Sequence, residues 1–285
     1  MRPQLQVSPG WVRGLLIAAA LGVLTLLLIL PLALVLTEAL RPGWRAFVGA
    51  LADADALAAL RLTLVAALVA VPVNTAFGLA AAWLIARKRF WGRDLMLGFI
   101  DLPFAISPVV SGLMLVLVFG RQGWLGPWLA AHHLRVVFTP LAVCLATVFI
   151  TVPFVAREVL PVLEAQGTDE EDAAAVLGAG PWTVFWRVTL PNLRWALLFG
   201  VVLCTARALG EFGAVSVVSG HIRGVTNTLP LHVETLYNEY QASAAFAGAA
   251  VLALLALVSL LAKAWIAHRA NAAMARGSGS GREDA

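Results

Sequence analysis

Charged residues are scarce in this sequence. Asp, Glu, Lys and Arg make up 13% of its 285 residues, whereas 61% are hydrophobic. A soluble domain carries roughly 25% charged and about 45–50% apolar residues, and a chain of this length cannot cover so much apolar surface within one water-soluble core. The shortage of charge therefore excludes a soluble globular protein and predicts that a lipid bilayer covers most of the chain.

The sequence also lacks the residues that most kinds of site need. It has no Gly-x-x-x-x-Gly-Lys-Ser/Thr loop for nucleotide phosphates, no row of carboxylates or histidines for a proton relay, and no zinc-binding spacing. Its two cysteines, Cys144 and Cys204, lie inside apolar runs, which favours packing over a disulfide. These gaps predict a chain that is not an enzyme and has no catalytic residue, metal or cofactor of its own. The lack of intramembrane carboxylates and histidines also argues against an ion-coupled secondary transporter, which stays as an alternative interpretation of the chain.

Six apolar runs are long enough to cross a membrane, since about 20 residues of helix span the hydrocarbon core. They cover residues 14–36, 62–86, 95–119, 136–156, 195–218 and 244–266. The first is too long for the core of a signal peptide, and no small-residue cleavage site follows it, so we expect it to remain as a span. The sequence thus predicts an all-α membrane protein whose six-span domain covers residues 14–268.

The positions of the basic residues predict the orientation. If the N-terminus is cytoplasmic, six Lys and Arg residues lie in the outer loops and thirteen in the inner segments, where the cluster Arg87-Lys88-Arg89 is the strongest signal. Because cytoplasmic loops carry the excess of basic residues, we expect both termini in the cytoplasm, as a segment over 1–13 and a flexible tail over 269–285. The formal net charge of +4 is therefore no indication of nucleic-acid binding.

The one long cytoplasmic loop, residues 157–193, has helical features of its own. Thr168 and Glu171 have the spacing of a capping box, in which the N-cap hydroxyl and the Glu three residues later reach back to each other. Acidic residues fill the first turn of the helix, where its dipole favours them, and Gly178 is suited to end it.

A second short helix is expected to follow that glycine. Gly180-Pro181 places Pro at the first helical position. Trp182, Phe185 and Trp186 then follow at i, i+3 and i+4, so they share one face. The prediction is an elbow of two helices with an aromatic stripe, for which a helix lying on the membrane surface is the competing interpretation.

The spacing in this loop resembles the EAA loop of permease subunits in binding-protein-dependent ABC importers. The matching residues are Asp172, Ala173, Ala174, Gly178, Val188, Leu190 and Pro191. Asp172 and Val188 depart from the family pattern, which has Glu and Ile, and both changes are conservative. The resemblance implies a type I ABC importer permease fold in a bacterial inner membrane. It also implies that this loop docks on a cytoplasmic ATPase and that the glycine turns between its two helices.

Three further segments are similar to the sulfate/thiosulfate members of that family. They are residues 101–112, 206–224 and 226–240. This similarity implies one of two sister permeases that form a heterodimer in lipid, with two ATPase copies and a periplasmic sulfate/thiosulfate-binding protein. The implied function is ATP-driven import of these anions by alternating access. Molybdate or tungstate is the alternative substrate.

Polar residues in and after the fifth run form the candidate translocation path. Arg207 and Glu211 lie one helical turn apart near the middle of that run, where an unpaired charge is costly. Two interpretations are open: a mutually neutralising structural pair, or an Arg that borders an anion path. The outer loop that follows offers Ser219, Thr226, Asn227 and Thr228 as neutral anion donors. That loop is equally compatible with docking of a binding protein or with a plain solvated loop.

Two prolines interrupt the third run. Pro103 and Pro108 remove backbone donors and must loosen the helix there. They predict a kink, which either shapes a pore or serves only packing.

Overall fold

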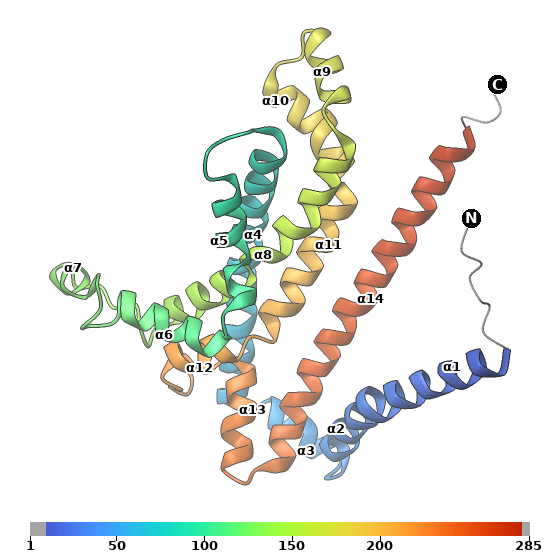
Figure 1. The fold of residues 1–285 in the computed structure, drawn as a ribbon. Coiled ribbons are helices and arrows are strands. Elements are labelled where there is room, and N and C mark those ends of the chain that lie inside the picture. Colours follow the sequence, from blue (N-terminus) through green and yellow to red (C-terminus); the bar gives the residue numbers. More distant parts are fainter. Residues whose placement is uncertain (1–9, 281–285) are drawn as a thin grey trace.

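The computed structural model describes residues 10–280, and every regular element in that range is a helix (Figure 1). The first half contains α1 (Gly10–Leu24), α2 (Leu30–Leu40), α3 (Trp44–Leu51), α4 (Ala54–Arg87), α5 (Arg93–Ala105), α6 (Pro108–Phe119) and α7 (Gly126–Ala131). The second half contains α8 (Pro140–Gln166), α9 (Asp169–Val176), α10 (Pro181–Val184), α11 (Leu190–Leu209), α12 (Gly213–Ser219), α13 (Leu229–Asn238) and α14 (Ala242–Ser280). Single π-helical turns, η1 (Thr25–Ile29) and η2 (Phe185–Thr189), join α1 to α2 and α10 to α11. The predicted all-α class is confirmed.

Helices α4, α8 and α11 form the centre of the bundle. Val155 of α8 is fully buried between two glycines, Gly78 of α4 and Gly200 of α11. A Cβ atom on Gly78 would lie 2.9 Å from the backbone nitrogen of Ala156, and one on Gly200 would lie 2.9 Å from the Cα of Val155. Small residues therefore let the three backbones approach closely, as is usual where helices meet inside a membrane.

Replacing Gly78 by leucine is expected to destabilise the bundle by about 3 kcal/mol or more, the upper range for overpacking, because backbone atoms of α8 block the new side chain. The measurement is the apparent melting temperature and membrane abundance of the variant. Gly98→Leu is the matched control, since nothing lies within 4 Å of a Cβ at Gly98 in α5. Equal loss of stability in both variants would contradict this account of the packing.

Five described helices are long and apolar enough to cross a membrane. They are Trp11–Leu40, Ala54–Arg87, Pro140–Gln166, Pro181–Leu209 and Ala242–Arg269. A sixth candidate is the pair α5 and α6, which is bent by 114°. The first, second and sixth predicted runs lie inside observed helices, whereas the third, fourth and fifth have different boundaries.

The third run is a broken helix and not a kinked one. Pro103 remains inside α5, and the chain leaves helical geometry at Ile106 and Ser107 before Pro108 begins α6. The residue before a proline is disfavoured in the α region, and Ser107 accordingly adopts φ −56° and ψ 136°. The break turns α6 sideways, out of the direction of α5 (Figure 1).

The fifth run is two helices. The prediction of one span over residues 195–218 is wrong at its end, because α11 stops at Leu209 and α12 starts at Gly213. Arg207 therefore lies in the last turn of α11 and not near the middle of a span. The outer loop expected after this run contains the helix α13.

The expected cytoplasmic loop, 157–193, is mostly helical. Helix α8 continues to Gln166 and ends before Gly167, whose φ is +65°. Two exposed ion pairs join this part of α8 to α5: Arg157 lies 2.7 Å from Asp101, and Glu164 lies 2.8 Å from Arg93. Only residues 167–168 and 177–180 separate α8, α9 and α10.

The flexible tail predicted from residue 269 is helical up to Ser280, where α14 ends. Four alanines between residues 270 and 275 favour the helix there, since alanine has the highest helix propensity, whereas nothing in the sequence of residues 277–280 favours it. Residues 281–285, and residues 1–9 of the predicted N-terminal segment, lie outside the described range.

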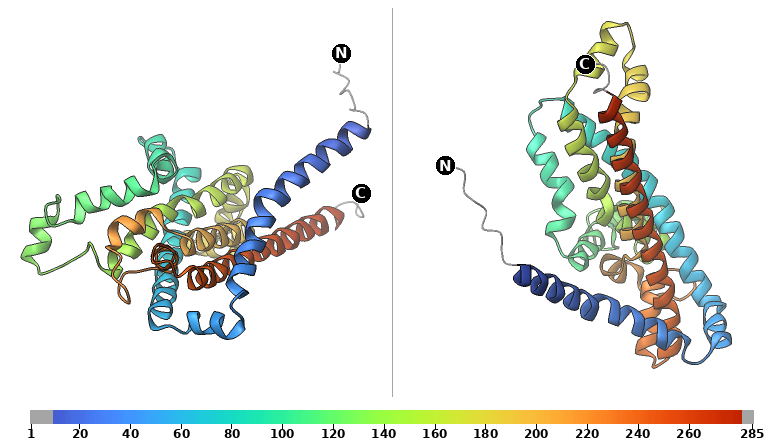
Figure 2. Two further views of the ribbon diagram at one scale, coloured as in Figure 1. Left: turned by 90° about the horizontal axis from the view of Figure 1, so that it is seen from below. Right: turned by 90° about the vertical axis from the view of Figure 1, so that its right-hand side faces the viewer.

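Several hairpins and short helices lie at one or the other end of the bundle. The α4–α5 hairpin, α9, α10 and the C-terminal part of α14 lie at one end, and α3 and α13 lie at the other (Figure 1). Helix α1 diverges from the bundle in both views of Figure 2, and its leucines are exposed. The predicted inner segments around residue 89, the α9–α10 region and the end of α14 therefore share one end.

Candidate coupling and translocation sites

The two short helices α9 and α10 project beyond the end of the bundle (Figure 1). Gly178 follows α9 with φ +88°, a left-handed conformation that glycine adopts without a Cβ penalty. Pro181 starts α10 after Gly180, as expected from the sequence. The second helix of the predicted elbow is not separate, however, because α10 continues through η2 into α11.

The predicted capping box is absent. Thr168 is the N-cap residue of α9, but its side chain makes no cap hydrogen bond. Glu171 instead forms a bidentate ion pair with Arg87 at the end of α4, with Nε–Oε2 and Nη2–Oε1 distances of 2.9 and 3.0 Å. The Thr189 hydroxyl donates to the same carboxylate at 2.8 Å. A partner on another helix has therefore replaced the local contact.

This ion pair ties the projecting helices to three long helices. Arg87 also donates from Nη1 to the carbonyl of Leu163 in α8 at 2.9 Å, and its side chain is only 7% exposed. Asn192 of α11 donates to Glu170 of α9 at 2.5 Å. Helix α9 is thus held to the end of α4 by half-buried hydrogen bonds and to the start of α11 by an exposed one, and Arg87 joins this network to α8.

Sequence reasoning did not find these anchoring residues. Arg87 counted only as a basic residue, Glu171 only as part of a cap, and Thr189 and Asn192 were not singled out. Arg87 and Glu171 are 84 positions apart, so no local pattern joins them.

The predicted aromatic stripe is confirmed as a cluster. The ring centroids of Trp182, Phe185 and Trp186 are 5.5–6.0 Å apart. Trp182 is 73% exposed, and Val176 and Leu177 beside the turn are each 88% exposed. The projecting end therefore carries a large uncovered apolar surface. Of the other motif residues, Asp172, Ala173 and Ala174 lie in α9, Val188 in η2, and Leu190 and Pro191 at the start of α11.

Arg207 and Glu211 form an ion pair at the break between α11 and α12. Nη1 of Arg207 lies 2.5 Å from Oε2 of Glu211. The other oxygen, Oε1, accepts a hydrogen bond from the backbone N–H of Ala214 at 2.9 Å, so the carboxylate also caps the start of α12. The Glu211 side chain is 1% exposed, whereas that of Arg207 is 32% exposed. The cation completes the end of one helix and the anion the start of the next, in agreement with their dipoles.

The break at residues 210–212 packs against the break in the third run. A Cβ on Gly213 would lie 2.7 Å from Cβ of Pro108, and one on Gly112 would lie 2.7 Å from the carbonyl oxygen of Ala214. The N-terminal ends of α6 and α12 therefore meet, and the ion pair lies beside this meeting point.

The four polar residues at and after the end of α12 do not form a solvated loop. Ser219, Thr226, Asn227 and Thr228 are all at most 3% exposed. The Thr226 hydroxyl donates to the carbonyl of Ser219 at 2.6 Å, which closes the loop on itself. Within the described chain the Asn227 amide and the Thr228 hydroxyl have no hydrogen-bond partner. These two residues therefore keep buried polar atoms available for a further contact.

The candidate path residues form two separate groups. Arg207 and Glu211 lie before α12, and the other four lie at or after its end. The seven residues of α12 separate them by roughly 10 Å at 1.5 Å per residue. In α13, which follows the second group, burial lowers the pKa of His232. The negative charges of Asp55 and Asp53 act in the opposite direction and raise this pKa.

Comparisons with known proteins agree with this architecture. The family model described as binding-protein-dependent transport system inner membrane component matches residues 74–271. The sulfate transport system permease protein CysW of Synechocystis is 54% identical over 90% of this chain and 94% of its own length. The corresponding protein CysT of Escherichia coli is 38% identical over 90% of this chain and 91% of its own length.

A solved structure shares the fold. A bacterial ABC transporter involved in the import of the acidic polysaccharide alginate matches with a TM-score of 0.74 and 17% identity, over 92% of this chain and 95% of that one. At this identity the likeness concerns the fold alone. Because the family model covers more than half of the sequence and both permease relatives cover nine-tenths of it, the chain belongs to the inner membrane components of binding-protein-dependent transport systems.

Proposed function

We propose that this chain is a permease subunit of an ATP-driven importer that moves sulfate or thiosulfate from the periplasm to the cytoplasm by alternating access. The observation that carries the proposal is the likeness, over 90% of the chain, to sulfate transport system permease proteins. The chain has no nucleotide-binding loop, so ATP hydrolysis falls to two copies of a cytoplasmic ATPase partner. We assign no cofactor to this subunit.

The membrane partner in this proposal is a different permease. The chain is 54% identical to a CysW protein and 38% identical to a CysT protein, which supports a CysW-like subunit paired with a CysT-like sister. The family description names a binding-protein-dependent system, and the periplasmic partner is accordingly a sulfate/thiosulfate-binding protein.

The ATPase is proposed to dock on the tip formed by α9 and α10. Large exposed apolar patches on a soluble surface mark interaction sites, and Val176, Leu177 and Trp182 are each at least 73% exposed there. The ion pair between Arg87 and Glu171 holds α9 to α4, so movement of the docked ATPase is passed directly to the long helices.

The anion path is proposed to pass Arg207. Its side chain is 32% exposed although that of its partner Glu211 is buried, and a partly exposed cation attracts a dianion. The buried donors of Asn227 and Thr228 lie beyond α12 on the outer side of this position. Neutral donors hold an oxyanion without a counter-charge.

Replacing Gly178 by alanine is expected to reduce co-purification of the ATPase and sulfate uptake several-fold. A Cβ at φ +88° costs roughly 1–2 kcal/mol, which shifts the turn that presents the apolar tip. Gly180→Ala is the matched control, because Gly180 has φ −68° and open space around it. Wild-type ATPase binding and uptake by the Gly178 variant would contradict the docking assignment.

The orientation is tested by labelling single cysteines with a membrane-impermeant maleimide. We expect labelling from the periplasm at positions 45, 132 and 223, and protection at position 89 and in the 177–180 turn. Position 223 is the probe of the loop after α12 because Asn227, in the same loop, is only 3% exposed. The native Cys144 and Cys204 are buried and are replaced by serine beforehand. Periplasmic labelling at position 89 would reverse the orientation.

The substrate is tested by uptake of radiolabelled sulfate into cells that lack their own sulfate importer. We expect uptake only when this chain is expressed with its sister permease, ATPase and binding protein, and we expect thiosulfate to compete. Uptake of molybdate without uptake of sulfate would overturn the assignment.

A further inference from the structure

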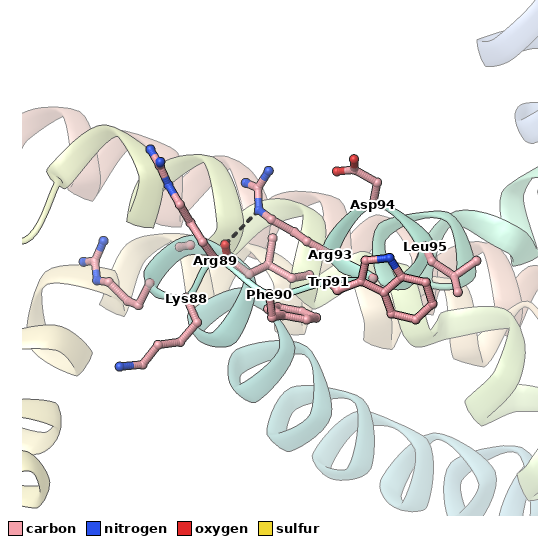
Figure 3. A pocket seen from close by; sticks show the side chains of 11 residues that line it. Lys88, Arg89, Phe90, Trp91, Arg93, Asp94 and Leu95 are labelled. Atoms are coloured by element: carbon pink, nitrogen blue, oxygen red, sulfur yellow. Dashed lines mark hydrogen bonds between the residues drawn. The ribbon is translucent and has the colours of Figure 1, made fainter.

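The hairpin between α4 and α5 carries four basic residues with different surroundings. Arg87 is paired with Glu171, and Arg93 is paired with Glu164 and donates to the carbonyl of Ile85. Lys88 and Arg89 are exposed and make no ion pair with any described residue. Figure 3 shows these two side chains projecting from the hairpin in different directions, so that positive charge is present on both sides of it.

A cleft and a groove adjoin this hairpin. The cleft has a volume of about 740 Å³ and is lined by residues 85–95. The groove, of about 250 Å³, is lined by Phe77, Gly92, Leu95, Met96, Phe99, Ile100 and Val152. The two share Gly92 and Leu95, so the groove continues the cleft down between α4, α5 and α8.

The cleft is lined by charged residues, whereas the groove is apolar. The cleft contains the free cations and Trp91, which is 97% exposed, whereas the side chains that line the groove are apolar. Leu95 and Phe99 are 60% and 63% exposed along the groove. Tryptophan favours the headgroup region of a membrane, and basic pockets between membrane helices on the cytoplasmic side bind anionic headgroups.

We propose that this hairpin binds an anionic phospholipid of the cytoplasmic leaflet. The positive charge of Lys88 and Arg89 on the two sides of the hairpin attracts its phosphate, Trp91 lies at the level of the headgroup, and one acyl chain follows the groove past Phe77 and Phe99. A free inorganic anion has no use for the apolar groove, and a zwitterionic lipid gains less from two unpaired cations. The proposal relies on the cytoplasmic orientation of the hairpin but not on the identity of the transported anion.

The test is lipid binding to the delipidated, assembled transporter, measured by native mass spectrometry with dioleoyl phosphatidylglycerol and dioleoyl phosphatidylcholine. We expect phosphatidylglycerol to bind more tightly to the wild type. The K88Q/R89Q variant should bind it roughly 10- to 30-fold more weakly, from about 1 kcal/mol per basic residue. The matched control K263Q/R269Q removes two cations from α14, whose end lies at the same end of the bundle (Figure 1), and should bind normally.

A second variant and a competitor test the groove. Phe99→Ala, at an exposed position, should weaken both lipids, since it removes an acyl contact and no charge. Unchanged phosphatidylglycerol affinity in K88Q/R89Q would overturn the proposal. Equally effective competition by soluble glycerol phosphate would show an anion site without a lipid. Loss of the ATPase from K88Q/R89Q with lipid binding intact would show that the hairpin is a protein contact instead.

Discussion

Replacing Arg87 by methionine is expected to release α9 from the bundle and abolish coupled transport. The Arg87 and Glu171 side chains are 7% and 17% exposed, and removing one partner of such a pair leaves an uncompensated charge at a cost of about 3–5 kcal/mol. The carbonyl of Leu163 loses its donor as well, and the Glu171 carboxylate keeps only the hydrogen bond from Thr189. Sulfate uptake and retention of the ATPase on the purified permease measure the effect.

A matched control comes from an exposed ion pair in the same chain. Arg41 and Glu38 lie 3.4 Å apart with side chains that are 77% and 43% exposed. Exposed pairs contribute about 0–1 kcal/mol, so Arg41→Met should leave ATPase retention unchanged. If Arg87→Met behaves like Arg41→Met, the buried pair does not hold the coupling helices.

The double variant Arg87→Met with Glu171→Gln distinguishes the cost of an unpaired buried charge from the loss of the contact that holds α9 in place. Removing both charges relieves the burial penalty, so membrane abundance should recover. ATPase retention should remain low, because neither methionine nor glutamine restores the bidentate contact that fixes α9 to α4. Recovery of both abundance and retention would assign Arg87 a role in stability alone.

The sequence predicts the spans better than the breaks between them. Hydropathy averages over about 20 residues, so it located the helices that continue through the bilayer and merged α11 with α12 into one run. The break before Pro108 follows from proline stereochemistry, but the size of the turn depends on α12 packing against α6 through Gly112 and Gly213. Such contacts join residues about 100 positions apart and leave no periodic pattern.

The same limit applies to the sites. The spacing around Gly178 predicted the turn and the aromatic cluster because both are local. Glu171 matched a local capping pattern, yet its carboxylate binds Arg87 of another helix instead. A charge-assisted bidentate contact is stronger than a capping hydrogen bond. For Ser219 and Thr226 the sequence left anion binding, docking of a binding protein and a solvated loop open, and the hydrogen bond from the Thr226 hydroxyl to the Ser219 carbonyl lets this segment be buried.

Removing Arg207 is expected to cost more than removing Arg207 and Glu211 together. In Arg207→Met the Glu211 carboxylate, 1% exposed, keeps its bond to Ala214 but loses its counter-charge. An uncompensated charge in this setting costs about 3–5 kcal/mol, so membrane abundance should fall sharply. In the double variant with Glu211→Gln the burial penalty disappears, and the glutamine carbonyl still accepts from Ala214, so abundance should recover.

Sulfate uptake by the double variant then tests the anion path. The proposed path needs the positive charge of Arg207, whose side chain is partly exposed. We therefore expect uptake to remain at least tenfold below the wild type although abundance is restored, as for the loss of about 1.4 kcal/mol or more of anion binding. Glu211→Gln alone is the informative companion: it keeps both the cation and the cap of α12, so it should retain more uptake than Arg207→Met at equal abundance. Full uptake by the double variant would make the pair purely structural, a clamp at the junction of α11 and α12. Normal abundance and uptake in both single variants would show that neither charge matters at this junction.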